Sequence, residues 1–238
     1  VAVLRFFRSL LVILSALLST LAISLGALFM VHVMGRSSKD TRVLAAAWGK
    51  FVLFVAGVRV TKKGGGSLDP AASYIFAANH QSQFDIPVLH GFLGHDFRWL
   101  AKKELFQVPI WGAAMRASGY IAIDRSQGRE ALRSLSEAAA EVAAGKSVVI
   151  FPEGTRSRDG RLKPFKKGAF RMAVDLGLPI LPLTVTGTRD VLPAGTSDLF
   201  PGSARLIIHP PVAVDGLTVA DCEQLSDTVR AVIDSSLP

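Results

Sequence analysis

The longest uncharged segment of the chain lies near its start. Ser9 to Met34 are 26 residues without Lys, Arg, Asp or Glu, and most of them are apolar. At about 1.5 Å of rise per residue, a helix of this length exceeds the roughly 30 Å hydrocarbon core of a bilayer. The segment is therefore long enough to cross a membrane.

Basic residues are more frequent after this segment than before it. Arg5 and Arg8 precede it, and Arg36, Lys39, Arg42 and Lys50 follow it. This excess favours a cytoplasmic location for the C-terminal side, so we expect the inner (cytoplasmic) membrane with the rest of the chain on its cytoplasmic side. A cleaved signal peptide is the competing interpretation. Its apolar region would span only about 7 to 15 residues before a small-x-small cleavage site, and no such site closes the segment.

A second apolar segment, Val43 to Val60, carries Lys50 and Arg59. This pattern suits a helix lying in the interface, with Lys50 reaching toward the headgroups. The two segments form either a hairpin dipped into one leaflet or a span followed by a surface helix. We therefore predict an anchoring segment over residues 1–61 and a second domain over residues 62–238.

The second domain follows a glycine-rich turn at Lys62–Ser67 and alternates strands with helices. Short apolar runs predict strands at Tyr74–Ala78, Phe97–Ala101, Tyr120–Ile123, Ser147–Phe151, Ile180–Thr186 and Ala204–His209. Apolar spacing of three or four predicts helices at Arg129–Ala144, Lys167–Leu176 and Val219–Ile233. This alternation is typical of an α/β domain with a mostly parallel central sheet flanked by helices, in which ligands bind beyond the carboxyl ends of the strands.

The charge balance indicates anionic partners. Twenty-seven basic and 19 acidic residues give a formal net charge of +8, which attracts acidic lipid headgroups, phosphorylated metabolites or nucleic acid. The single cysteine, Cys222, excludes an internal disulfide and a cysteine zinc site. No carboxylate cluster has metal-ligand spacing, so we expect neither a metal nor another cofactor.

His80 and Asp85 follow the first predicted strand of the domain. A histidine, with an unperturbed pKa of about 6.5, can take a proton from an alcohol when a carboxylate holds its other ring nitrogen. Asp85, in the first turn of a helix that runs toward Leu93, is close enough in the chain to do this. A buried structural histidine bonded to the backbone would fit the same pattern.

Glu153, Gly154, Thr155 and Arg156 follow another predicted strand. The glycine allows a ligand to approach the backbone, the threonine can donate a hydrogen bond, and the guanidinium matches phosphate oxygens. A solvated turn is the alternative. Lys102, Lys103 and Arg125 add cations near the same sheet edge, and a basic run from Arg158 to Lys167 follows.

Four segments together resemble the four ordered blocks of the glycerolipid acyltransferases, most closely the bacterial 1-acyl-sn-glycerol-3-phosphate acyltransferases. They are NHQSQFD at 79–85, IAIDR at 121–125, FPEGTRS at 151–157 and ILPL at 180–183. Their order and spacing are similar to those of the family over about residues 70 to 190, and so is the apolar N-terminal segment. Ala122 departs from the family pattern, in which a bulkier residue is common, and this leaves the acceptor preference open.

The resemblance implies specific roles. His80 would act as the general base and Asp85 would orient it, while Glu153, Gly154, Thr155 and Arg156 would bind phosphate with help from Arg125 and Lys102 or Lys103. The implied reaction moves a fatty acyl group from acyl-CoA or acyl carrier protein to the sn-2 hydroxyl of lysophosphatidic acid and gives phosphatidic acid.

Two alternatives to this function remain. One is the same chemistry on glycerol 3-phosphate, another lysophospholipid or a lyso-aminolipid. The other is a non-catalytic membrane module that binds acidic lipid. Membrane phospholipids are expected partners and nucleic acid is not, because the cations are not interleaved with aromatic residues.

Overall fold

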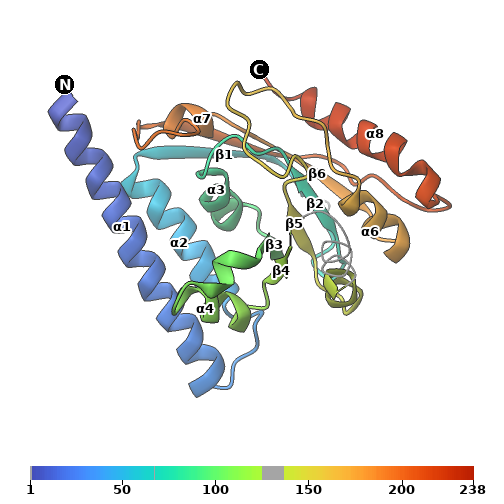
Figure 1. Ribbon diagram of the computed structural model, residues 1–238, viewed down its shortest axis with the longest axis horizontal. Coiled ribbons are helices and arrows are strands. Elements are labelled where there is room, and N and C mark those ends of the chain that lie inside the picture. Colours follow the sequence, from blue (N-terminus) through green and yellow to red (C-terminus); the bar gives the residue numbers. More distant parts are fainter. Residues whose placement is uncertain (1, 67, 125–136) are drawn as a thin grey trace.

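A seven-stranded sheet forms the centre of the computed structural model, which describes residues 2–66, 68–124 and 137–238 (Figure 1). The strand order is β1-β7-β6-β2-β5-β3-β4, and all neighbours pair in parallel except β6 and β7. The strands are Val58–Gly64 (β1), Ile75–Ala78 (β2), Arg98–Lys102 (β3), Ile121–Ile123 (β4), Val148–Ile150 (β5), Ile180–Thr186 (β6) and Gly202–Ile208 (β7). The predicted α/β fold with a mostly parallel sheet is confirmed.

Helices cover both faces of the sheet because its central strands are apolar on both sides. In β2, Phe76 and Ala78 face a core shared with helices α2 (Arg42–Val55) and α3 (Asp85–Phe92). Ile75 and Ala77 face the opposite core, which includes helices α6 (Gly168–Leu176) and α8 (Cys222–Asp234). This alternation follows from the twofold period of a strand.

Four further helices of the α/β domain are short. They are α4 (Trp111–Ala117), α7 (Thr188–Val191) and the 3₁₀ helices η2 (Lys103–Gln107) and η3 (Val219–Asp221). Residues 137–143 are helical, which agrees with part of the helix predicted at Arg129–Ala144. The first part of that prediction lies outside the described residues. The six predicted strands all occur, with ends shifted by at most two residues.

The prediction of one helix over Val43–Val60 is wrong at its C-terminal end. Helix α2 ends at Val55, the chain turns at Gly57 with a φ of 66°, and Val58–Gly64 form strand β1. Lys62–Gly64, expected in a turn, pair in parallel with β7. The partner that makes this segment a strand lies about 140 residues further along the chain, at Gly202–Ile208. The division of the chain at residue 61 stays a prediction, although β1 lies across that position.

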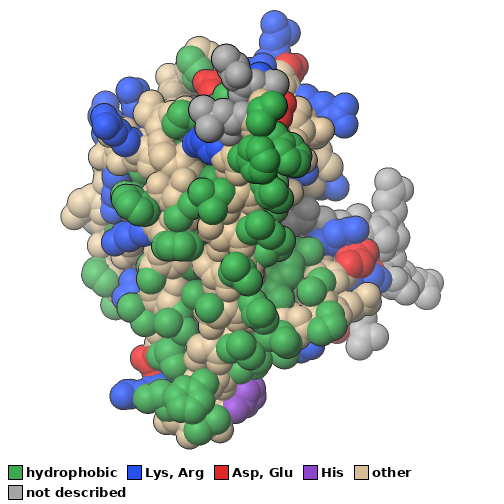
Figure 2. Space-filling view, turned by 90° about the vertical axis from the view of Figure 1, so that its left-hand side faces the viewer, with side chains coloured by type: hydrophobic (Ala, Val, Ile, Leu, Met, Phe, Trp, Pro, Cys, Tyr) green, Lys and Arg blue, Asp and Glu red, His purple; other side chains and the backbone are tan. Residues whose placement is uncertain are grey.

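Helix α1 (Ala2–Leu28) continues into a π-helical turn, η1 (Phe29–Val33). Arg5–Val33 is long and apolar enough to cross a membrane, and only 17% of its most apolar window is buried. Figure 2 shows hydrophobic side chains along the length of the face that α1 occupies. The exposed apolar residues include Phe6, Leu10, Leu14, Leu17, Leu21, Leu25 and Phe29 of this segment, Val43 and Phe54 of α2, and Val108, Ile110 and Trp111 beside α4. A face of this kind is typical of contact with lipid.

Polar contacts attach α1 to the rest of the protein. The Arg8 guanidinium donates hydrogen bonds to the carbonyl oxygens of Leu199, at 2.6 Å, and Ala56, at 2.5 Å. The Ser9 hydroxyl accepts a bond from the Leu199 amide at 3.0 Å. Further along, the Trp48 indole donates to the Thr20 hydroxyl at 3.1 Å. Helix α1 therefore lies along the side of the domain.

Candidate functional site

His80 and Asp85 lie in direct contact at the carboxyl end of β2. The Nδ1 atom of His80 is 2.8 Å from Oδ2 of Asp85, the first residue of α3. The preceding Asn79 holds this loop to β6 through two hydrogen bonds with the backbone of Val185, of 2.8 and 2.7 Å. The pairing expected from the spacing of the two residues is therefore present.

The Asp85 carboxylate is fully buried and satisfied by four donors. Oδ2 also accepts hydrogen bonds from the amides of Gln81, at 2.8 Å, and Ser82, at 2.9 Å. Oδ1 accepts a bond of 2.5 Å from the hydroxyl of Thr188 in α7. These donors offset the cost of burying the charge and hold the carboxylate in one orientation. Nothing in the local sequence pointed to Thr188, which is 103 positions away from Asp85.

The ring of His80 is fixed on one face by Phe151. The two rings stack with centroids 3.8 Å apart and planes 11° apart, and 15% of the His80 side chain stays exposed. Since an ionised carboxylate can only accept, Nδ1 carries the proton that it donates to Asp85. Nε2 is then the basic nitrogen, available to a ligand.

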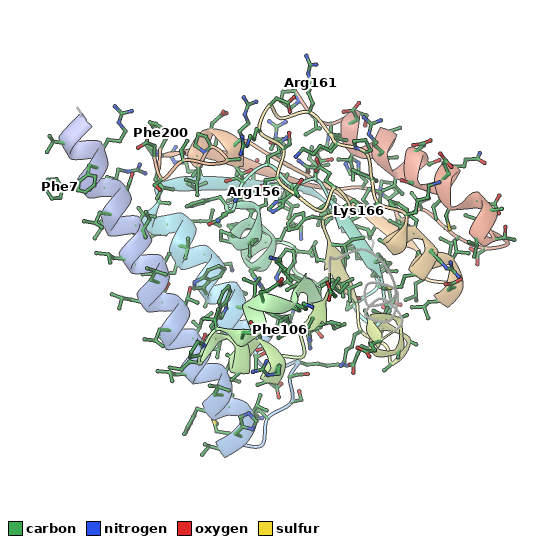
Figure 3. All side chains as sticks on the ribbon, viewed as in Figure 1. Phe7, Phe106, Arg156, Arg161, Lys166 and Phe200 are labelled. Carbon is green, nitrogen blue, oxygen red and sulfur yellow. The ribbon has the colours of Figure 1, made fainter. Side chains whose placement is uncertain are left out.

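A polar cavity of about 570 Å³ opens beside His80. Gly154, Thr155, Arg156, Arg158 and Lys163 line it together with Ala194 and Gly195. Arg156 is half-buried, and its guanidinium forms no hydrogen bond or ion pair within the described part of the chain. In Figure 3, Arg156 lies over the interior of the molecule and Arg161 at its outer edge. Arg156 is therefore placed to bind an anion in this cavity.

Glu153 connects the two sequence motifs. Its Oε1 atom accepts a hydrogen bond of 2.8 Å from the His80 amide, and Oε2 accepts one of 3.0 Å from the Lys163 amide. The carboxyl is buried, and this burial raises its pKa although both hydrogen bonds and the nearby charge of Lys163 act in the opposite direction. Both oxygens are engaged within the protein, so Glu153 holds the loop that carries His80.

Lys163 is a lining residue that the sequence did not single out. Its ammonium donates hydrogen bonds to the Thr155 hydroxyl, at 3.1 Å, and to the Arg156 carbonyl oxygen, at 2.8 Å. The only signal in the sequence was the basic run from Arg158 to Lys167, and a run of charges does not show which members face inward. Lys163 therefore holds Thr155 and Arg156 in the wall of the polar cavity.

An apolar cavity of about 280 Å³ meets the polar one at His80. Its walls include Thr20 and Ile23 of α1, Trp48 of α2, Trp99 and Lys102 of β3, Trp111 and Met115 of α4, and Tyr120 and Phe151. Within the described part of the chain, His80 is the one residue that lines both cavities. His80 therefore lies between a polar cavity lined by cations and an apolar chamber.

Of the remaining predicted cations, the two that the structure describes do not line the polar cavity. Lys102 lines the apolar chamber, and its ammonium is 3.3 Å from the Glu104 carboxylate. Lys103 pairs with Asp124. Arg125 lies outside the described residues. His80, Gly154, Thr155 and Arg156 are thus brought together at one cavity, with Asp85 and Glu153 behind them.

Comparison with known proteins identifies relatives of the chain. A family model described as "Acyltransferase" matches residues 59–186. A chloroplastic 1-acyl-sn-glycerol-3-phosphate acyltransferase of Brassica napus is 40% identical over 139 residues, which are 58% of this chain and 40% of that protein. The human 1-acyl-sn-glycerol-3-phosphate acyltransferase alpha is 32% identical over 199 residues, 83% of this chain and 70% of the relative. The chain thus spans less than half of the length of the Brassica relative.

A solved structure has the same fold. It is the crystal structure of the 1-acyl-sn-glycerophosphate (LPA) acyltransferase PlsC from Thermotoga maritima, with a TM-score of 0.85 and 28% sequence identity. The match covers 98% of this chain and 95% of that one. It therefore includes both the N-terminal helices and the α/β domain.

Proposed function

We propose that this chain, which belongs to the acyltransferase family, transfers a fatty acyl group from a thioester to the sn-2 hydroxyl of 1-acyl-sn-glycerol 3-phosphate. The product is phosphatidic acid, and the donor is acyl-CoA or acyl carrier protein. The observation that carries the proposal is the place of His80 between a cavity with an unpaired guanidinium and an apolar chamber. The acceptor phosphate needs the cationic cavity, the acyl chain needs the apolar chamber, and the reacting ends of both must reach the same base.

His80 and Asp85 are the proposed catalytic pair. Nε2 of His80 removes the proton of the acceptor hydroxyl as its oxygen attacks the thioester carbonyl, and a C–O bond forms. The tetrahedral intermediate then collapses, the C–S bond breaks, and the proton on the imidazole passes to the leaving thiolate. Asp85 keeps the ring in the required tautomer and stabilises the imidazolium, as expected for a His–carboxylate pair. The reaction needs no covalent enzyme intermediate.

The acceptor phosphate is assigned to Arg156. A guanidinium offers two parallel N–H donors to phosphate oxygens, and Gly154 leaves room for close approach. Holding the phosphate fixes the hydroxyl relative to His80, and such positioning contributes up to roughly 7–11 kcal/mol to lowering a barrier. The cavity of about 570 Å³ also admits larger headgroups, so another lysophospholipid is the second candidate acceptor.

The apolar chamber is assigned to the acyl chain. Thr20 and Ile23 of α1 and the exposed Trp111 belong to its wall, so the chamber adjoins the face that is suited to lipid. An acyl chain can then pass from the bilayer to His80 without crossing water. This avoids a free-energy cost of about 0.8 kcal/mol for each CH₂ group that water would otherwise contact.

The membrane arrangement that we propose is insertion into one leaflet. Helix α1 is bonded to Leu199 at Arg8 and to Trp48 of α2 at Thr20, and its C-terminal half packs against α4. A helix that crossed the bilayer would have to carry one of these attachment points through the hydrocarbon core. Attachment to the inner membrane from the cytoplasmic side remains our prediction.

A labelling experiment separates the two arrangements. In a Cys222→Ser background, single cysteines replace Val3 and Ser37, which flank the apolar helix. Both should react with a membrane-impermeant maleimide from the same side of sealed vesicles. Labelling from opposite sides would show that the helix spans the membrane.

Acyl transfer is tested with purified protein, one labelled thioester and a panel of acceptors: lysophosphatidic acid, glycerol 3-phosphate, lysophosphatidylcholine and a lyso-aminolipid. Lysophosphatidic acid should give the highest kcat/KM. His80→Ala should lower kcat by at least about a thousandfold, within the range of a general base together with its orientation, with an unchanged circular dichroism spectrum. Turnover retained by folded His80→Ala protein would rule the mechanism out.

A further inference from the structure

A third cavity adjoins the apolar chamber, with which it shares Ala45, His90 and Tyr120. It has a volume of about 250 Å³ and is formed by the first half of α2, the end of α3 and the start of β3. Arg42, Lys50, Arg98, Val43 and Phe97 belong to its lining, and His80 does not. Its volume corresponds to roughly eight waters in the liquid, enough for a phosphate with its glycerol. The proposed acyl transfer makes no use of this cavity.

Arg98 is a buried cation in this lining with an unmet hydrogen-bond donor. Its side chain is 3% exposed, and its Nη1 atom donates to the Asp96 carboxylate, at 2.6 Å, and to the Phe97 carbonyl oxygen, at 2.8 Å. Its Nε atom is buried and has no hydrogen-bond partner among the residues that the structure describes. A buried N–H left without an acceptor costs about 1–3 kcal/mol. This nitrogen is enclosed, but Arg98 lines the cavity, so an anion bound there would meet the rest of its guanidinium.

Two further cations of the lining have no side-chain partner in the part of the chain that the structure describes. Arg42 and Lys50 are exposed and form no side-chain hydrogen bond or ion pair with any described residue. Asp96 compensates only Arg98. The cavity therefore holds two uncompensated positive charges beside a buried donor, which is the electrostatic environment that phosphate prefers.

Apolar residues complete the cavity and connect it to the lipid-facing surface. Phe97 and Ala46 supply uncharged wall, and Val43, which is 63% exposed, belongs to the same apolar surface as the outer face of α1. A ligand in this position would have its anionic group near Arg42, Lys50 and Arg98 and its apolar part directed toward the bilayer.

We propose that this cavity is a second phosphate site, which holds the headgroup phosphate of an anionic membrane lipid. The bound lipid would accept hydrogen bonds from Arg98 and from the two free cations, and would fix the depth and tilt of the α1–α2 pair in the membrane. The chemistry recognised is a phosphate ester, which a soluble phosphate could also supply. Binding is independent of acyl transfer, because it needs neither His80 nor an acyl donor.

Native mass spectrometry of the full chain in a neutral detergent tests the site. Dioleoyl phosphatidylglycerol is titrated into wild-type protein and into the double variants Arg42→Gln/Lys50→Gln and Arg36→Gln/Lys39→Gln. Both variants lose two positive charges near the same end of the anchor, but Arg36 and Lys39 do not line the cavity. Thermal melting of each variant verifies folding.

The wild type should retain one lipid saturably. Arg42→Gln/Lys50→Gln should weaken this binding by at least about tenfold, as expected for the loss of one charge-assisted hydrogen bond or more, while Arg36→Gln/Lys39→Gln should stay within about twofold. Arg98→Lys keeps the charge but removes the planar guanidinium with its several N–H donors, so its affinity should fall between the two. Equal weakening in both double variants, or equally tight binding of phosphatidylcholine, would overturn the proposal.

Competition identifies the source of the phosphate. Inorganic phosphate and glycerol 3-phosphate are added in separate arms at concentrations up to the millimolar range. If neither displaces the lipid, the site recognises the lipid as a whole, as proposed. Displacement by either one at the concentration of the lipid itself would contradict a lipid ligand and assign the cavity to a soluble phosphate.

Discussion

The hydroxyl of Thr188 donates a hydrogen bond of 2.5 Å to the Oδ1 atom of Asp85. This contact joins α7, which follows β6, to the start of α3 and leaves Oδ2 facing the imidazole of His80. The orientation of the proposed base thus depends on a residue in another part of the fold. Thr188 is a positioning residue, because it reaches the reaction only through Asp85.

Replacement of Thr188 by valine should lower kcat by roughly ten- to a hundredfold, the value of one hydrogen bond to a charged group. The KM for the acceptor should change little, because Thr188 does not line the polar cavity. Thr188→Ser keeps the hydroxyl and should restore most of the activity. Steady-state kinetics of the three proteins decide this, and a loss of the same size in the serine variant would refute the role of the hydroxyl.

Arg156→Gln should raise the KM for lysophosphatidic acid by about ten- to a hundredfold, because one charge-assisted phosphate contact is lost. The matched control is Arg161→Gln, which makes the same charge change on an exposed residue of the same loop (Figure 3). Kinetics at saturating donor give the two KM values. An equal rise in both variants would mean that the general charge of the loop acts, rather than a specific site.

Met115 should influence acyl chain length. It lines both the apolar chamber and a cavity of about 50 Å³ beside it. Met115→Ala would join the two spaces and should shift the preference toward longer chains, while Met115→Phe should shift it toward shorter ones. Each additional CH₂ that the chamber accepts contributes about 0.8 kcal/mol at most. The assay compares kcat/KM over a series of acyl-CoA lengths, and an unchanged profile in both variants would exclude this position as a determinant.

His90 should make the protein less stable in acid. Its Nε2 atom accepts a hydrogen bond of 2.8 Å from the Trp99 indole, and burial lowers the pKa of His90 to about 3. In the unfolded chain the pKa of His90 is near 6.5, so below that pH the unfolded state binds a proton that the folded state does not. This contribution to stability is therefore complete above pH 6.5 and is lost as the pH falls toward 3, by at most about 1.4 kcal/mol per pH unit.

Melting temperatures measured between pH 7.5 and 4.5 test this dependence. His90→Gln keeps an acceptor for Trp99 but cannot titrate, so its curve should be flatter than that of the wild type over this range. His32→Gln, at an exposed position, should follow the wild type. Parallel curves for wild type and His90→Gln would show that other groups cause the acid sensitivity.

The positions of strand β1 and Lys163 depend on contacts between distant segments, which local sequence patterns do not predict. Helix α2 ends at Val55 and a strand begins at Val58 because β7 offers a free edge to Val58–Gly64, and that edge does not exist until distant strands have paired. Lys163 was one basic residue among several, and only the fold of its loop turns it toward Thr155. Glu153 was expected to meet the substrate, and in the structure its two oxygens hold backbone amides.

Local sequence patterns are sufficient to predict the long apolar N-terminal helix, six strands alternating with helices, and the pairing of His80 with Asp85. These depend on interactions between residues close in the chain, or on a periodicity that each segment carries alone. Three features appear only in the folded chain: His80 lies between a cation-lined cavity and an apolar chamber, Thr188 holds Asp85, and Arg42, Lys50 and Arg98 line another cavity. Those features arise from segments up to about a hundred residues apart, whose contacts form only when the core is packed.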